Sequence, residues 1–303
     1  MHSSPDCLNC AVNQCRKIVR LVGGDQALEQ RVIETLLPGF AHLDQSEPPS
    51  TYTSHILLAA MELLDERDPF RAVKQQQNDS ARPIAEALDR ELGDGPSALV
   101  TALALAAAGN VIDSGPGHKY TIEGALSHLH FAHDDSALLL DRLTRAARVM
   151  YVLDNAGEVL FDLLVLKRLR VPELTIVARS SPILNDVTVD EARALGFDRY
   201  GRLIGTGSPF LGVDFRTVSA EFRAAYEHAD TVIAKGHANF ESLVSGPRDG
   251  FFLLKAKCDL VARELGIKTG DSACFYSPGI GKQRPRQPTA TALVSETPCS
   301  LDS

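Results

Sequence analysis

The sequence lacks an excess of positive charge. Its 31 Lys and Arg residues are outnumbered by 39 Asp and Glu residues, which leaves a formal charge of −8. Proteins that bind nucleic acids or membrane surfaces usually present basic faces to them, so this balance argues against both as general partners. It still leaves room for a local basic pocket that binds a small anion.

The sequence also lacks a hydrophobic run long enough to cross a membrane. The longest one, residues 98–112, includes Thr101 and Asn110 and is typical of a buried helix instead. Residues 1–10 show no basic start followed by an apolar stretch, so no secretion signal is visible. We therefore expect a cytoplasmic protein.

Cysteine is scarce, and its distribution does not suggest a disulfide framework. Without a secretion signal, a reduced setting is expected for the six residues. Cys7 and Cys10 supply only half of a tetrahedral metal site, and no sequence argument brings Cys15 or Cys258 to them. Helix packing is the favoured interpretation. The cysteines are Cys7, Cys10, Cys15, Cys258, Cys274 and Cys299.

Two further signatures are incomplete. Gly205 and Gly207 are not followed by the third glycine of a dinucleotide-binding loop, which argues against a nicotinamide enzyme. His128, His130 and His133 have the spacing of a ligand cluster, but no acidic partner pattern accompanies them. Solvent-facing histidines are the favoured interpretation of this second motif.

Strand patterns are missing from the first half of the chain. With 44% hydrophobic and 23% charged residues, the composition is that of a globular protein, and residues 1–147 show almost only helical periodicity. We expect these residues to form an all-helical N-terminal part. The expected helices cover residues 4–21, 25–37, 52–65, 69–92, 96–110 and 121–143.

Strand and helix patterns alternate after residue 148. Short apolar runs at residues 149–154, 173–179, 229–236 and 251–257 predict strands, with a weaker one near residues 200–204. Such alternation predicts a mostly parallel sheet between two helical layers, an α/β domain over residues 148–277. Residues 278–303 contain four prolines and many polar residues, which is typical of a disordered tail.

Polar residues follow several of the expected strands. Because ligands of an open parallel sheet gather beyond the carboxyl ends of its strands, these residues are the candidates for chemistry. Asp154, Asn155 and Asp186 offer hard oxygen ligands, which suit magnesium, manganese or a similar divalent ion. An ordinary capping turn is the alternative interpretation of each segment.

Lysines and a glycine turn follow two other strands. Lys235 and Lys255 could neutralise a phosphate, and the turn of residues 236–239 could present backbone N–H groups to the same anion. A lysine on a strand more often extends its charge to solvent, so each residue alone is a weak signal. A metal, an ammonium group and backbone amides at one sheet edge would equip a site for phosphoryl transfer or hydrolysis.

Several separated motifs occur in the order found in a known family. They are DNAGE at residues 154–158, PILNDVT at 182–188, KG-x-x-NFE at 235–241 and FFLLKAKC at 251–258, preceded by SPDCLNC, DPFRAVKQQQN and AGNVIDSG. Together they resemble the metal-dependent damage-control phosphatases, the ARMT-like family, in its prokaryotic branch with paired N-terminal cysteines. The resemblance covers residues 3–274.

The resemblance implies a fold, an activity and a site. The fold is a Rossmann-like α/β/α sheet domain with a helical N-terminal part, and the activity is hydrolysis of phosphate monoesters of small metabolites with one divalent ion (Mn, Mg, Co or Ni). The substrate would be a sugar phosphate or a phosphopantetheine-like molecule. The implied metal ligands are Asp154, Asn155 and Asp186, and the implied catalytic residues are Asp154, Asp186 and Lys255.

The resemblance also implies the substrate contacts. Glu158 would orient the metal shell or a water, and the family usually has Gln and Gly where this chain has His237 and Ala238. Asn110 and Asp113 would close the pocket from the helical part. The residues implied to contact substrate are Asp154, Asn155, Lys235, Gly236, His237, Ala238, Asn239, Lys255, Asn110 and Asp113.

Two other functions compete with the phosphatase. An S-adenosylmethionine-dependent protein carboxyl methyltransferase would need a glycine-rich loop after the first strand, and none is present. A non-catalytic protein that binds a phosphorylated metabolite would need no open metal positions. The sequence leaves the nucleophile open between a water and Asp154, and it does not indicate an oligomeric state.

Overall fold

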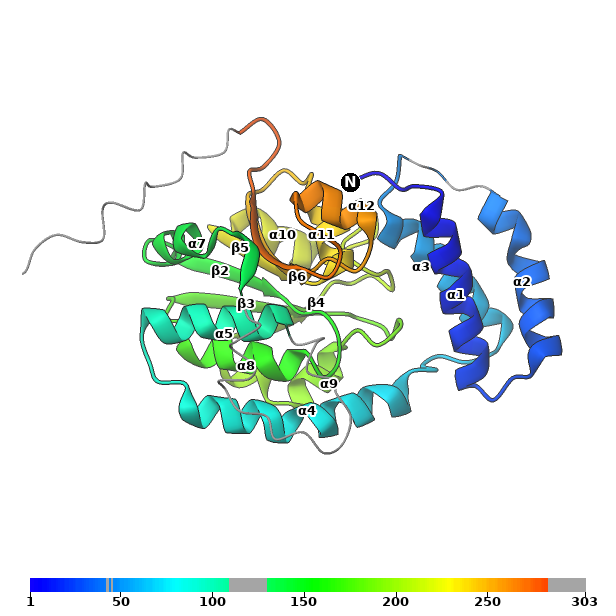
Figure 1. Cartoon of the computed structure of the whole chain (residues 1–303), viewed down its shortest axis with the longest axis horizontal. Coiled ribbons are helices and arrows are strands. Elements are labelled where there is room, and N and C mark those ends of the chain that lie inside the picture. Colours follow the sequence, from blue (N-terminus) through cyan, green and yellow to red (C-terminus); the bar gives the residue numbers. More distant parts are fainter. Residues whose placement is uncertain (42–43, 45, 109–129, 283–303) are drawn as a thin grey trace, which may run out of the picture.

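The computed structural model describes residues 1–41, 44, 46–108 and 130–282. Within these ranges no helix is long and apolar enough to span a membrane. Figure 1 shows a central sheet with helices on both faces and a group of three helices beside one end of the sheet. The N-terminus lies near α12 (Asp259–Leu265), at the top of this view.

The sheet of the described chain has the strand order β1-β7-β6-β5-β2-β3-β4. Its neighbouring strands are parallel except β6 and β7, which pair antiparallel. The carboxyl ends of β2, β3 and β5 therefore meet at one edge. The strands are β1 (Phe131–Asp134), β2 (Arg148–Val152), β3 (Glu173–Ala178), β4 (Arg202–Gly205), β5 (Thr231–Lys235), β6 (Gly250–Lys255) and β7 (Ser272–Ser277).

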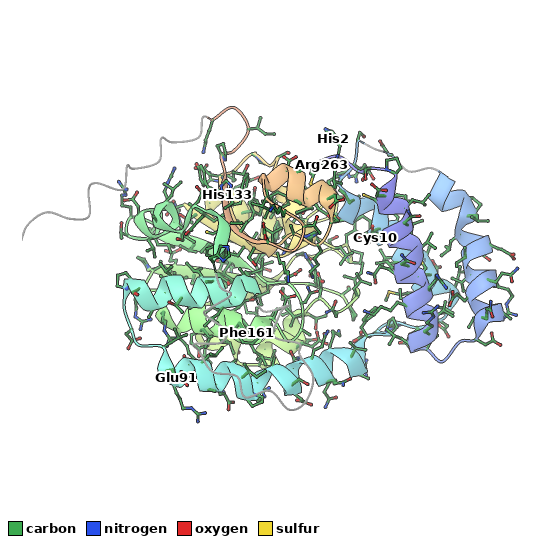
Figure 2. All side chains as sticks on the ribbon, in the orientation of Figure 1. His2, Cys10, Glu91, His133, Phe161 and Arg263 are labelled. Atoms are coloured by element: carbon green, nitrogen blue, oxygen red, sulfur yellow. The ribbon has the colours of Figure 1, made fainter. Side chains whose placement is uncertain are left out.

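One face of the sheet is covered by helices from both halves of the chain. Tyr151 and Ile233 point to this side and share a core with Phe161 of α8. Phe161, labelled in Figure 2, is 1% exposed. Thr188 caps α9 with a capping box, which fixes where that helix begins. The helices are α4 (Arg71–Glu91), α5 (Pro96–Ala108), α7 (Ser136–Leu143), α8 (Val159–Arg168) and α9 (Val189–Ala194), with a short turn η2 (Phe197–Arg199) after α9.

The other face packs on three helices of the second half. Met150 and Val152 alternate with the residues above and join Phe240 and Phe252 in a separate core. Ser219 accepts a hydrogen bond from the Phe222 amide and so caps the first of these helices. The helices are α10 (Ala220–His228), α11 (His237–Leu243) and α12 (Asp259–Leu265).

The three N-terminal helices form their own apolar core. They are α1 (Asp6–Leu21), α2 (Gln26–Ala41) and α3 (Pro49–Leu63). Cys15, Ile18 and Leu57 are fully buried among them, and Ile183 and Leu211 from the sheet domain join the same core. Figure 2 shows Cys10 on this three-helix group. The group is thereby packed against loops that follow β3 and β4.

Most expected elements are confirmed, and three differences stand out. The prediction of a helix over residues 121–143, and with it of an all-helical part over residues 1–147, is wrong for residues 131–134, which form β1, and β7 was not predicted. β1 is an edge strand of four residues, and β7 lies beside it. Residues 278–282, assigned to the tail, contact the body: Ile280 donates its amide hydrogen to the Gly246 carbonyl and Lys282 pairs with Asp249. The rest of the expected tail lies outside the described residues.

Candidate active site

The loops that follow β2 and β3 lie side by side. The Val187 amide donates to the Asp154 carbonyl at 2.9 Å, and the Ala156 amide donates to the Asn185 carbonyl at 2.8 Å. Asn155 and Asp186 are paired in an antiparallel bridge between the two loops. The structure thus brings together Asp154, Asn155 and Asp186, the three residues for which a metal-binding role was expected.

The Asp186 loop is held in an unusual conformation. Leu184 has φ = 45°, a left-handed backbone that a branched side chain rarely adopts. The Asp186 amide donates to the Ile183 carbonyl, which closes the turn, and Ile183 is buried in the core of the three-helix group. The conformation of this loop therefore depends on the N-terminal helices.

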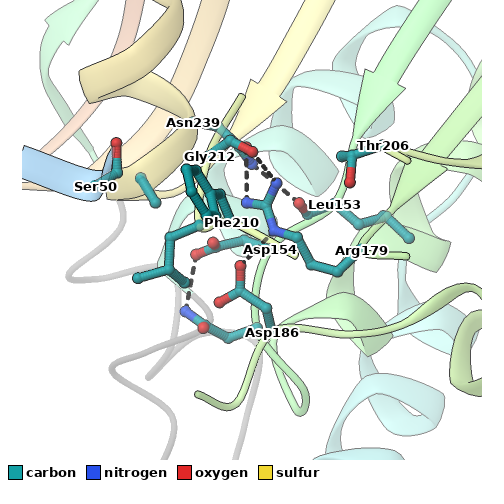
Figure 3. Close-up of polar contacts among 12 residues, drawn as sticks. Ser50, Leu153, Asp154, Arg179, Asp186, Thr206, Phe210, Gly212 and Asn239 are labelled. Atoms are coloured by element: carbon teal, nitrogen blue, oxygen red, sulfur yellow. Dashed lines mark hydrogen bonds and ion pairs between the residues drawn. The ribbon is translucent and has the colours of Figure 1, made fainter. Parts of the chain in front are cut away.

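Arg179 ties three segments of the site together. Its Nε donates to Asp186 Oδ2 at 2.7 Å, one Nη donates to the Gly212 carbonyl at 2.5 Å and the other to Asn239 Oδ1 at 2.9 Å (Figure 3). The Arg179 side chain is 2% exposed. Arg179 was assigned no role from the sequence. Its position at the end of a buried strand, seven residues before Asp186, was nevertheless a signal for such an ion pair.

Carboxylates outnumber cations in the buried part of the site. Burial, then Asp186 and Glu158, raise the pKa of Asp154 well above its usual range, against the opposing charges of Lys257 and Arg179. Burial also raises the pKa of Glu158. The Asn155 amide nitrogen donates to Asp154 Oδ2 at 2.8 Å and to Glu158 Oε1 at 3.0 Å, so it crosslinks two of these carboxylates.

The turn after β5 touches the Asp154 carboxylate. Gly236 has φ = 78°, and a Cβ atom at this position would lie 1.9 Å from Asp154 Oδ2. A side chain of any kind would displace that carboxylate, so glycine is required on both conformational and steric grounds. The structure therefore places the expected phosphate turn directly against an expected metal ligand.

Two residues of that turn are bound to the protein itself. Lys235 is 1% exposed, and its ammonium group donates to Asp162 Oδ1 at 2.8 Å and to the Ala106 carbonyl at 2.7 Å. The Asn239 amide nitrogen donates to the carbonyls of Leu153 and Lys235. Their side-chain groups thus hold the turn, and on this geometry we do not assign Lys235 or the Asn239 side chain to the phosphate.

His237 also contacts the backbone rather than the Asp154 carboxylate. The Lys257 amide donates to its Nε2 at 2.8 Å, and the Lys255 carbonyl lies 2.9 Å from the same nitrogen. Burial, followed by the charge of Lys257, lowers the pKa of His237 to about 4. The imidazole is therefore neutral near pH 7 and positions the segment that carries both lysines.

Lys257 is a second cation at the end of β6, and it was given no role on the basis of the sequence. It is exposed, lies just beyond β6, and its charge acts on Asp154, Glu158 and His237. Lys255, the expected phosphate ligand, is the last residue of β6 and is half-buried. The KAK spacing was itself the available signal, since it places two lysines around one strand end. Asn110 and Asp113 lie outside the described residues.

The cysteine and histidine motifs do not form ligand sites in the described chain. Within it, no three His, Cys, Asp or Glu residues are arranged to hold a metal, and the Asp154 trio is of another kind because it includes an asparagine. Burial raises the pKa of Cys10, and so do its neighbours Glu241, Cys7 and Cys258, which keeps its thiol protonated. His133 contacts Asp135, and His128 lies outside the described residues.

The fold and the site define an α/β protein with an oxygen-rich anionic centre at the edge of a mostly parallel sheet. Residues 3–273 match the family model of the damage-control phosphatase ARMT1-like domain. The chain belongs to this family, as the resemblance of its motifs implied. Its homologues are named phosphatases, which supports phosphatase activity on damaged or side-product metabolites.

Similar proteins cover almost the whole chain. A damage-control phosphatase from Pyrococcus horikoshii is 35% identical over 89% of this chain and 96% of its own length. One from Archaeoglobus fulgidus is 32% identical over 89% and 98%. The crystal structure of a DUF89 family protein from Pyrococcus horikoshii superposes with a TM-score of 0.81 at 33% identity, covering 91% of this chain and 99% of that one.

Proposed function

We propose that the protein hydrolyses phosphate monoesters of small metabolites and needs one divalent ion, such as Mn, Mg, Co or Ni. The observation that carries the proposal is the juxtaposition of Asp154, Asn155 and Asp186 across two bridged loops. Asp154 and Asp186 are 4% and 3% exposed, so their repulsion is weakly screened by water. A bound cation would offset that repulsion.

The donor set fits a hard divalent cation. Two carboxylates and an amide oxygen are preferred ligands of magnesium and manganese, and three protein ligands leave positions for water and substrate. Arg179 holds one oxygen of Asp186, so the other oxygen is the one we assign to the metal. The Asn155 side chain already lies among the carboxylates, where its amide nitrogen donates to Glu158. With the nitrogen directed to Glu158, its amide oxygen would be free to bind the metal.

The chain's own groups provide the remaining functions. When bound, the ion would polarise the phosphate and neutralise part of its charge. Lys257, with Lys255 beside it, would neutralise the rest, because its charge already reaches Asp154 and Glu158. Gly236 would let the phosphate turn approach, since it carries no side chain.

The substrate is a small phosphorylated metabolite, and we propose a sugar phosphate or a phosphopantetheine-like molecule. The sheet edge supplies groups for the metal and the phosphate. Recognition of the leaving group would then come from the helical part, and Asn110 and Asp113 are our candidates because they match a family motif. The nucleophile is a water or Asp154. Acid quench during turnover separates the two, since only attack by Asp154 leaves a phosphorylated residue 154 for mass spectrometry.

A metal-dependent phosphatase assay tests the proposal. Protein stripped with chelator is offered a panel of phosphorylated metabolites, alone and with Mg, Mn, Co or Ni. We expect turnover only after a metal is added, and none in a chelated sample. Metal-independent turnover would refute the metal requirement, and binding of phosphorylated metabolites without release of phosphate under any condition would refute the activity.

A further inference from the structure

Helix α4 reaches the candidate active site from the N-terminal half of the chain. In Figure 1 it runs from the three-helix group along the lower side of the sheet domain, below α9 and α8. Lys74, Gln77 and Asn78 have the helical spacing i, i+3 and i+4, so they share one face of this helix. Each of the three contacts a segment that follows β2 or β3.

The first contact fixes the loop that carries Asp154 and Asn155. Asn78 Oδ1 accepts a hydrogen bond from the Gly157 amide at 2.7 Å. Gly157 has φ = 80°, and a Cβ atom there would lie 3.2 Å from Gln77 Cβ. The loop therefore packs closely on α4 at its glycine, two residues after Asn155.

The second and third contacts fix the loop that carries Asp186. Asn185, its neighbour in sequence, donates from Nδ2 to Gln77 Oε1 at 3.1 Å. Lys74 is 2% exposed and lies 2.7 Å from Glu191 Oε1 and 3.0 Å from Asp68 Oδ2. Glu191 in turn accepts from Thr188 in the capping box that ends this loop. One helical face thus contacts both loops.

We propose that Gln77 and Asn78 are positioning residues that hold the two ligand loops in metal-binding register. The proposal rests on the proposed function. The Ala156–Asn185 hydrogen bond joins the two loops. Helix α4 binds Gly157, next to Ala156, on one loop and the Asn185 side chain on the other. Loss of either side chain would let one loop shift against the other while the ligands themselves stay in the chain.

The docking of α4 does not depend on these two residues. Its C-terminal half packs Ala85 and Leu88 into the core that α8 shares. Asp89 also forms ion pairs with Lys167 and Arg168 of α8. A substitution at position 77 or 78 therefore leaves the helix anchored, and its effect should fall on the loops.

The test measures binding of Mn²⁺ alone to chelator-stripped full-length protein by calorimetry. Asn78→Ala should weaken Mn²⁺ binding about tenfold, as expected when an outer hydrogen bond to a metal site is lost. Gln77→Ala should act in the same direction. The matched control is Gln76→Ala, an exposed glutamine on the same helix, which should leave the affinity unchanged. Asn78→Asp keeps an acceptor oxygen for the Gly157 amide and should therefore retain most of the wild-type Mn²⁺ affinity.

Two further readouts separate positioning from general stability. Amide hydrogen exchange of residues 155–158 should speed up in Asn78→Ala, while exchange in β5 and β6 stays as in the wild type. At saturating Mn²⁺ the kcat of this variant should recover to within about threefold of wild type, because the ligands are intact.

The outcomes are distinct. Unchanged Mn²⁺ affinity and unchanged exchange in Asn78→Ala, with a wild type that binds Mn²⁺ and hydrolyses phosphate esters, would overturn the positioning role and leave the proposed function standing. A wild type that binds no divalent ion would overturn both proposals. Equal losses in Asn78→Ala and Gln76→Ala would also contradict the positioning role, since they would show a general effect of the helix.

Discussion

Two buried groups of charges lie within one helical turn of each other and differ in balance. In the first, Asp162 of α8 pairs with Lys235 and accepts a hydrogen bond from Tyr151 at 2.8 Å. Burial lowers the pKa of Lys235, but Asp162, followed by Glu158 and Asp154, raises it above its usual value, so the lysine stays charged. The second group begins four residues earlier, at Glu158, and includes Asp154.

The second group contains three buried carboxylates and one buried guanidinium. Asp186 is paired with Arg179, while Asp154 and Glu158 share the amide of Asn155. A group of charges that neutralises itself has a structural role, because it needs nothing from outside the chain. The second group keeps a surplus of negative charge, and this surplus supports the proposal that a cation binds there. Neighbouring carboxylates on one helix can therefore have opposite roles, and the partners decide which.

The largest effect should follow from removing a ligand of the anionic group. Asp186→Ala should lower the proposed metal-dependent turnover by about a thousandfold or more, since it removes a proposed metal ligand and leaves Arg179 without its carboxylate. Turnover is measured with saturating metal, and circular dichroism verifies the fold. Turnover close to that of the wild type, with the same metal dependence, would show that the metal lies elsewhere.

The balanced group should respond in stability rather than in catalysis. Lys235→Met leaves Asp162 buried without its cation and should cost about 3–5 kcal/mol of unfolding free energy. The double variant Lys235→Met with Asp162→Leu should recover part of this loss. Chemical denaturation measures both. A fall in kcat of the folded protein in the double variant would contradict the comparison and return Lys235 to the active site.

The two lysines at the end of β6 should differ in effect. Lys257→Met should lower kcat/KM about a hundredfold, the cost of losing one electrostatic stabiliser, because its charge acts on the carboxylates of the site. Lys255 is the lysine for which phosphate binding was expected from the sequence. The loss of kcat/KM in Lys255→Met measures how much of the proposed phosphate binding depends on it. Steady-state kinetics of the two variants decide between them. A loss below threefold for either lysine would remove that lysine from the site.

The smallest effect concerns the pH dependence of stability. The folded-state pKa of His237 is about 4, below the ordinary value of 6.5, so the unfolded chain binds the proton more readily between these values. Stability from neutral His237 is present above pH 6.5 and is lost as pH falls through 4. His237→Gln keeps an acceptor for the Lys257 amide and removes this loss.

Thermal unfolding between pH 7.5 and pH 4 measures this difference. Tm of the wild type should fall by a few degrees more than Tm of His237→Gln over this range. His228→Gln, on the exposed end of α10, is the control and should behave as the wild type does. Parallel curves for wild type and His237→Gln would show that the imidazole is already accessible to protons in the fold.

The sheet was predictable because its central strands are buried on both faces. Residues 149–154, 173–179, 229–236 and 251–257 read as continuous apolar runs, and each lies on an observed strand. The edge strand β1 has only four residues, FAHD, and its neighbour β7 mixes polar and apolar residues in SACFYS. The pairing of β1 with β7 depends on contact between distant parts of the chain, which local periodicity does not encode.

The meeting of Asp154 and Asp186 was predictable because parallel neighbouring strands end at one edge of the sheet. The position of Lys235 was not. Alternation along β5 directs Ile233 and Lys235 to the face covered by α5 and α8, whereas Val232 and Ala234 face the other helices. The parity of a residue at the end of a strand therefore decides which face of the sheet its side chain joins.

The contacts of α4 were beyond sequence reasoning for a different reason. Asp68, Lys74 and Asn78 match a family motif and were expected either to line the domain interface or to contact substrate, but the sequence named no partner for them and gave Gln77 no role. More than seventy residues separate Asn78 from Gly157. Such a contact depends on how the helix docks against the loops, and docking is set by the apolar residues of its other half.

The position of β1 in the sheet determines how late in synthesis the sheet can be completed. β1 pairs with β7 and with no other described strand, and β7 comes about 140 residues later in the chain. On the ribosome, residues 131–134 must therefore wait until almost the entire sheet has been synthesised before they find a partner. A fragment that ends at residue 147 would carry this strand unpaired. The two halves of the chain are consequently one unit of folding, and expression of the first half alone should yield aggregated protein.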